Sequence, residues 1–204
     1  MYSYCMVSPQ VETSLQLKPG HTTDYLSFLS KAAQEITGSL DYAATLKSVA
    51  NAMVPHLSDW CAVDIIQDDG RLKRLAIAHV DPKKIKKALE VAKKYPRGPK
   101  AESGTSHVIR TGESEMRNGI TDEMLVAAAT NEEHLSMMRD LSFYSLMIVP
   151  IKSRSKILGT ITLVWAESKQ IYSMADLAFA ETLAALAGGA IDNAQLYQAA
   201  TSHN

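Results

Sequence analysis

The chain is poor in cysteine, and it lacks the motifs on which most catalytic chemistry depends. Its two cysteines, Cys5 and Cys61, are too few and too far apart for a disulfide framework or a cysteine-based metal motif. No Gly-rich phosphate loop, no Gly-x-Ser-x-Gly elbow and no His-Glu-x-x-His motif occurs in the sequence. We therefore expect no catalytic residue, no bound metal and no enzymatic activity, in a reducing, cytoplasmic setting.

Long apolar runs and a strong net charge are missing as well. No uninterrupted apolar run approaches the roughly 20 residues of a membrane-spanning helix, and the N-terminus lacks the apolar core of a signal peptide. A formal net charge of -1 creates no overall attraction to nucleic acid or to an anionic membrane, so we expect neither as a partner. The length of 204 residues and an apolar content of 46% predict one globular domain with extensions.

Two blocks of paired apolar runs stand in the middle and later parts of the chain. Trp60–Pro82 and Ser145–Glu167 each contain two runs rich in Val, Ile, Leu and Thr around a polar turn, which is the pattern of a β-hairpin. In the run from Cys61 to Ile66, alternate residues point to opposite faces and most of them are apolar. Both faces of this predicted sheet should therefore be covered.

Helical periodicity is found around and between these blocks. Apolar residues recur at three- and four-residue steps from Asp24 to Thr37, and Asp41 is placed to cap a second helix. Pro82 should open a basic helix. Further elements are expected as helices at residues 104–112, 122–129, 132–140 and 173–199 and as a short strand at 115–117. We predict an irregular tail at 1–23, one domain at 24–199 and a C-terminal tail at 200–204.

Four pieces of the sequence carry further information when taken in order: LSDWCAVDIIQDDGRLKRLAIAHVDP, GTSHVIRTGE, LMIVPIKSRSKILGTITLV and DLAFAETLAALAGGAIDNAQLY. Together they resemble the GAF domains of bacterial signalling proteins, such as sensor histidine kinases and phytochromes. The resemblance implies an α+β fold, in which a central antiparallel sheet of five or six strands has the N- and C-terminal helices on one face and a ligand-pocket insert on the other. It also implies a downstream effector, because GAF domains usually precede kinases, cyclases, phosphatases or transcription regulators.

The resemblance leaves the ligand open, because one fold hosts many functions. The Asn-Lys, Phe and Asp-Glu signature of cyclic-nucleotide GAF domains cannot be aligned with this chain. The helix around His134 lacks the Cys-His pair of cyanobacteriochromes, which leaves noncovalent bilin, or haem held by His79 or His134, as an alternative. Free-methionine sulfoxide reductases, which are also GAF domains, need several pocket cysteines, and neither Cys5 nor Cys61 is placed to supply the attacking thiolate.

Candidate ligand contacts come mainly from the region between and within the hairpins, where GAF pockets are built. Methionine adapts to flat apolar ligands and to irregular gaps alike, so a methionine cluster here fits pocket lining or core filling. The basic stretch from Lys83 to Lys100 could hold an acidic group or form a solvated helix face. The expected ligand-binding residues are Asp64, His79, Met116, His134, Met138, Met147 and Thr162.

The last helix shows alternating three- and four-residue steps that resemble a coiled-coil seam. Gly188 and Gly189 weaken this helix, which predicts that a neighbouring element approaches its backbone closely. The expected dimer-interface residues are Leu29, Ile36, Leu183, Leu186, Ala190 and Tyr197. We expect a non-catalytic sensory module that binds an unidentified small molecule and signals as a homodimer to an effector such as a histidine kinase. A ligand-free domain for dimerisation or docking is the main alternative.

Overall fold

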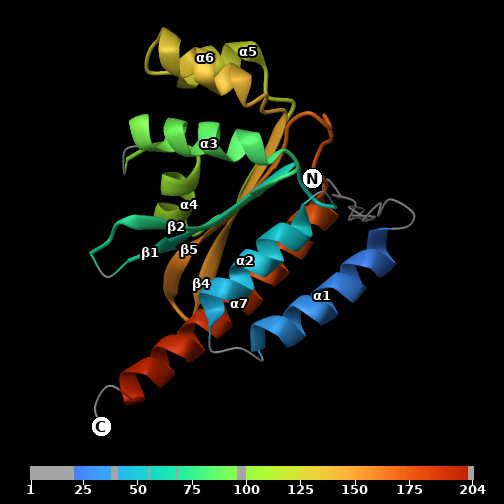
Figure 1. Cartoon of the computed structure of the whole chain (residues 1–204), viewed down its shortest axis with the longest axis vertical. Helices are drawn as coiled ribbons and strands as arrows, with labels where there is room; N and C mark the ends of the chain where they lie inside the picture. The colour runs from blue at the N-terminus through green and yellow to red at the C-terminus, as the bar shows by residue number, and fades with distance from the viewer. Residues whose placement is uncertain (1–20, 38–40, 55, 68, 96–99, 202–204) are drawn as a thin grey trace, which may run out of the picture.

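The two predicted hairpins form the centre of one antiparallel sheet (Figure 1). The computed structural model describes residues 21–37, 41–54, 56–67, 69–95 and 100–201. The strands in these ranges are β1 (Trp60–Ile66), β2 (Leu72–His79), β3 (Glu115–Asn118), β4 (Ser145–Ser153) and β5 (Lys156–Trp165). Their order is β2-β1-β5-β4-β3, and each neighbouring pair is antiparallel. The expected α+β fold with its central antiparallel sheet is confirmed.

Helices cover both faces of this sheet. They are α1 (His21–Thr37), α2 (Tyr42–Met53), α3 (Pro82–Lys94), α4 (Thr105–Thr111), α5 (Asp122–Ala128), α6 (Glu132–Asp140) and α7 (Met174–Thr201). Figure 1 shows α1, α2 and α7 on one face and α3 to α6 on the other. The expected division into terminal helices and a central insert is therefore confirmed. Helix α1 begins at His21, before the expected start at Asp24.

The hydrophobic core lies between the sheet and the helices α1, α2 and α7. Cys61, Val63 and Ile65 of β1 point into this core, as strand alternation predicts. Leu183 and Ile191 of α7 are fully buried in it, because α7 packs along β4. The sheet face toward the terminal helices thus carries the main hydrophobic core.

The residues expected at a dimer interface mostly belong to this core. Ile36, Leu183 and Ala190 are only 1%, 0% and 9% exposed within a single chain. Leu29 and Leu186 are half-buried and pack against the same cluster. The apolar stripe of α7 therefore faces the sheet of its own chain. The sequence could not show this, because an apolar stripe at helical spacing can pack on a sheet or on a second helix. Of this set, only Tyr197, 54% exposed, lies largely open to a partner.

Helix α7 also has the length and composition of a membrane span. The stretch Met174–Tyr197 has a mean hydropathy of 1.4, although polar residues interrupt its apolar runs. We had expected no such segment from the uninterrupted runs alone. Core helices of water-exposed domains pass the same test, and α7 packs against β4 along its buried face.

Ion pairs attach the basic helix α3 to the rest of the insert. Lys87 Nζ lies 2.8 Å from Asp140 Oδ2, and Lys94 Nζ lies 2.5 Å from Glu133 Oε1, so both lysines contact α6. Exposed pairs of this kind contribute about 0–1 kcal/mol each, because solvent screens them. They position α6 above the sheet. They also show that two lysines of the basic stretch pair with acidic residues of this chain, which the sequence did not predict.

A buried aspartate joins the start of β1 to the segment that follows β5. Asp59 is 1% exposed. Its Oδ2 accepts hydrogen bonds from the backbone N–H groups of Ala166, at 2.7 Å, and Ser168, at 2.9 Å. Its Oδ1 accepts the hydroxyl hydrogen of Ser168. This carboxylate thus fixes the chain between the sheet and α7.

Asp59→Ala is expected to lower the free energy of unfolding by about 2 kcal/mol, because it leaves two backbone N–H groups without an acceptor. Urea denaturation of both proteins measures this loss. Asp69→Ala is the matched control, since Asp69 lies on the exposed β1–β2 turn and, among the described residues, pairs with Arg71. We expect the control to change stability by less than about 1 kcal/mol. Equal effects of the two substitutions would contradict the assigned role of Asp59.

Candidate functional site

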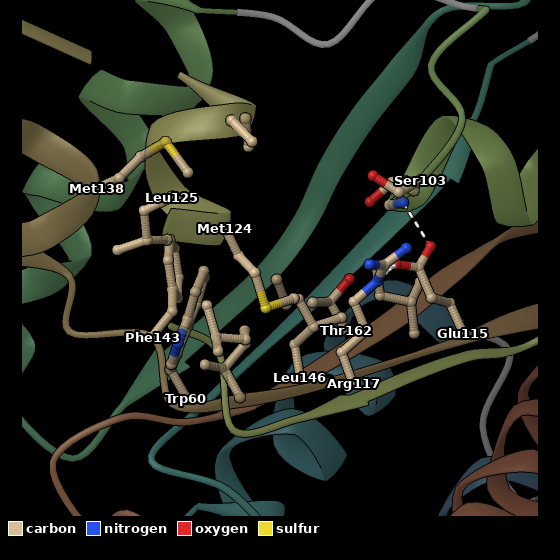
Figure 2. Close-up of a pocket in the computed structure, with 18 of the residues that line it drawn as sticks. Trp60, Ser103, Glu115, Arg117, Met124, Leu125, Met138, Phe143, Leu146 and Thr162 are labelled. Atoms are coloured by element: carbon tan, nitrogen blue, oxygen red, sulfur yellow. Dashed lines mark hydrogen bonds and ion pairs between the residues drawn. The ribbon is translucent and has the colours of Figure 1, made fainter. Parts of the chain in front are cut away.

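A cavity of about 450 Å³ lies on the sheet face opposite the core. Its floor is formed by all five strands, and its cover by α5, α6 and the start of α4 (Figure 2). Most of its lining is apolar, and the few polar groups include Arg74, Glu115, Arg117 and Thr162. Small-molecule sites in proteins commonly have this size and composition.

One end of the cavity is aromatic and apolar. Trp60, at the start of β1, stacks on Phe143 with ring centroids 5.6 Å apart and an interplanar angle of 25°. Met138 of α6 and Leu125 of α5 lie beside these rings (Figure 2). Trp60 also stacks on His79 with a centroid distance of 6.5 Å. These contacts fix the indole as a flat wall of the cavity.

The other end of the cavity is polar, and β3 supplies its main side chains. Glu115 and Arg117 are two positions apart on this strand, so both point to the cavity face. Arg117 Nε donates to Glu115 Oε1 at 2.7 Å. Glu115 Oε2 accepts the backbone N–H of Gly104 at 2.5 Å, where α4 has no side-chain cap of its own. Glu115 thus joins β3, the start of α4 and the cavity.

A second ion pair lies on the cavity face of β1 and β2. Asp64 and Arg74 are directly opposite each other in the antiparallel register. Arg74 donates from Nε to Asp64 Oδ1 and from Nη2 to Asp64 Oδ2, both at 2.8 Å. Both carboxylate oxygens of Asp64, an expected ligand contact, are occupied by Arg74. Arg74, rather than Asp64, borders the cavity.

Two of the expected ligand contacts line the cavity. Met138 is a 5% exposed residue of α6, and Thr162 lies on β5 with its hydroxyl buried and without a hydrogen-bond partner among the described residues. Met116 and Met147 do not line it, because they pair across β3 and β4 and pack on the core face. Side chains alternate between the two faces of a strand, so a core position for Met116 would have placed Glu115 and Arg117 on the cavity face.

The two expected histidine contacts lie outside the cavity. His79 stands behind Trp60, and its Nδ1 accepts the backbone N–H of Asp81 at 2.8 Å. Burial, and then the charge of Lys84, lower the pKa of the His79 imidazole, which keeps it neutral near pH 7. His134 stacks on Tyr95 with a centroid distance of 4.2 Å, where α6 contacts the end of α3. Neither ring is placed to hold a group bound inside the cavity.

Metal ligands and thiols do not gather at this site. In the part of the chain that the structure describes, no three His, Cys, Asp or Glu side chains are grouped so that they could hold a metal ion. Cys61 is fully buried on the core face, where burial and the charge of Asp64 raise the pKa of its thiol to about 12. Cys5 lies outside the described residues.

Comparisons with known proteins agree with this architecture. The GAF domain family model matches residues 39–192. The GAF domain from a phosphoenolpyruvate-protein phosphotransferase of Coxiella burnetii is 21% identical, with a TM-score of 0.63 over 87% of this chain and 98% of that chain. The corresponding GAF domain from Acinetobacter is 19% identical, with a TM-score of 0.62 over 86% of this chain and 96% of that chain.

An enzyme is also among the similar structures. Free methionine-R-sulfoxide reductase from Neisseria meningitidis, solved in complex with its substrate, is 13% identical, with a TM-score of 0.58 over 85% of this chain and 91% of that chain. Likeness at such identities shows the fold and not the activity. No curated protein sequence matches this chain. The match of the family model to most of the chain, together with the sheet and helix arrangement, shows that the chain belongs to the GAF domain family.

Proposed function

We propose that this GAF domain is a non-catalytic sensory module that binds a small amphiphilic molecule in the cavity covered by α5 and α6. The observation that carries the proposal is the cavity itself, about 450 Å³ in volume with one aromatic and one polar end. GAF domains generally act in sensing and signalling. A non-catalytic role is supported by the position of Cys61, whose thiol faces the core and not the cavity.

The strand β4 connects this cavity to the terminal helices. Leu146 and Ile148 line the cavity, whereas Met147 and Val149 between and beside them pack in the core under α7. We propose that ligand binding shifts this strand and thereby α7, and that α7 passes the change to an effector such as a histidine kinase in a cytoplasmic two-component system. Such coupling requires that the ligand bind the two arrangements with different affinities.

A homodimer through the terminal helices remains part of this proposal, with a different surface from the one expected. The buried stripe around Leu183 is occupied by the chain's own sheet. Ala185, Gly189 and Asn193 lie on the exposed face of α7 at four-residue steps, which supports this face as the contact between copies. Native mass spectrometry counts the subunits in the same experiment that tests ligand binding.

Freshly purified protein is expected to carry a noncovalent mass in its native spectrum that disappears on denaturation. Met138→Trp should reduce the occupancy at least tenfold, because the larger side chain fills the cavity. Met174→Trp is the matched control, since Met174 is 60% exposed at the start of α7. Leu125→Trp is a second test on α5, a helix without buried residues, in case Met138→Trp fails to fold.

The same samples distinguish the alternatives. A colourless protein without extra mass would overturn the proposal in favour of a ligand-free dimerisation or docking domain. An absorption band in the visible range, together with the extra mass, would identify a bilin or a haem instead of a colourless ligand. Retention of the extra mass by both cavity variants would place the bound molecule outside this cavity.

A further inference from the structure

The two carboxylates at the polar end of the cavity are already engaged by the protein. Glu115 accepts from Arg117 Nε with one oxygen and from the Gly104 N–H with the other. Asp64, which pairs with the cavity residue Arg74, accepts a hydrogen bond at each of its oxygens as well. The two carboxylates therefore hold the surrounding groups in place, and they are poorly suited to receive a donor from a ligand.

Hydrogen-bond donors remain available at the same end. Arg117 uses only Nε within the described structure, so its two terminal NH₂ groups have no protein partner. Its side chain is 46% exposed and lines the cavity on the same strand as Glu115 (Figure 2). The Thr162 hydroxyl has no hydrogen-bond partner within the described residues, but its oxygen is buried, so the guanidinium is the donor that a ligand reaches. Two parallel donors on a guanidinium match the planar oxygens of a carboxylate.

The opposite end accepts a flat apolar group. The stacked rings of Trp60 and Phe143 form one wall there, and Met124 and Leu125 lie close to them (Figure 2). A cavity of about 150 Å³ accommodates one benzene ring, so the 450 Å³ available here has room for about two or three rings. Aromatic rings also pack favourably, edge-on or offset, against other aromatic rings.

We infer that the ligand is a planar aromatic carboxylate of about two rings. Its rings lie against Trp60 and Phe143, and its carboxylate accepts hydrogen bonds from the terminal nitrogens of Arg117. Glu115 acts as a positioning residue, because its bond to Nε orients the guanidinium toward the cavity. This inference rests on the proposed function, since it names the class of molecule that the sensory cavity takes.

Calorimetric titration with 2-naphthoate and with its neutral isostere 2-naphthamide tests this assignment on the full chain. The carboxylate is expected to bind at least tenfold more tightly than the amide. Arg117→Met should remove this preference, whereas Arg117→Lys, which keeps the charge and loses the paired donors, should reduce it in part. Arg71→Met is the control, because Arg71 is 79% exposed on the β1–β2 turn and lies outside the cavity, where it pairs with Asp69.

Each outcome separates the ligand class from the proposed function. Equal binding of the two probes, unaffected by Arg117→Met, would overturn the carboxylate assignment and leave the sensory cavity in place. Binding that Met138→Trp does not weaken would place the probe outside the cavity and also overturn it. Failure of both probes to bind would overturn the aromatic class, and the native mass of the purified protein would then decide the proposed function separately.

Discussion

Gly188→Ala is expected to destabilise the domain by about 3 kcal/mol, whereas Gly189→Ala should stabilise it by about 1 kcal/mol. Both glycines lie inside α7, so alanine improves the helix propensity equally at the two positions. A methyl group at Gly188 would overlap the backbone of Lys152, with its carbonyl carbon only 2.7 Å away. At Gly189, no atom of the described residues lies within 4 Å of the added carbon, apart from the surrounding backbone of α7 itself. The two substitutions thus change stability in opposite directions because β4 lies against Gly188 and not against Gly189.

Chemical denaturation of the two variants and the wild type measures this difference in the free energy of unfolding. The overlap at Gly188 involves main-chain atoms, which cannot rotate away as a side chain would, so α7 must move from β4 or the strand must bend. Similar stability of the two variants would show that α7 does not lie so close to β4. The gain at Gly189 is expected for the single chain, and a loss there at concentrations at which the proposed dimer forms would support a second copy packed on this face.

The thiol of Cys61 is expected to react about a thousandfold more slowly in the folded protein than an exposed thiol does at pH 8. Burial first, and then the negative charge of Asp64, raise its pKa from 9.0 to about 12. Only the thiolate attacks, and raising the pKa by three units lowers the thiolate fraction at pH 8 about a thousandfold. Enclosure in the core reduces access of the reagent further, because Cys61 is 0% exposed.

Iodoacetamide labelling of the Cys5→Ser variant, with and without denaturant, measures this reactivity at the remaining cysteine. We expect rapid labelling only after unfolding. A control with Cys61 also replaced and Ser155→Cys added on the exposed β4–β5 turn should react at the same rate in both conditions. Rapid labelling of folded Cys61 would reopen thiol chemistry, and with it the reductase activity that the proposed function excludes.

The sequence was sufficient for the elements of the fold and for many of their ends, because local interactions set them. Asp41 caps α2 by accepting the N–H of Ala44 at 3.0 Å, as its position before the apolar period predicts. Pro82 begins α3, and Gly112 ends α4 with a φ of 72°, a conformation that glycine adopts without strain. Each of these signals acts over about four residues.

The candidate site was predicted less completely, although the sequence pointed to the right region. Thr162 and Met138 line the cavity. Met147, from the same set of expectations, lies in the core on the other face of the sheet. Apolar residues occur on both faces of β4, so composition cannot tell which face receives the terminal helices. The polar groups that line the cavity, Glu115 and Arg117, were not among the expected contacts. Met116 between them was expected instead, and it packs against the core.

The sequence by itself thus determined the strands, the helices, the order in which they follow one another and the resemblance to the GAF family. Only the tertiary structure decided that α7 turns Leu183 toward its own sheet and that Glu115 reaches the N–H of Gly104. A period of two or of 3.6 residues shows that two faces differ, and it carries no information about what each face meets. That choice depends on packing between segments far apart in the chain, and the same packing creates the cavity.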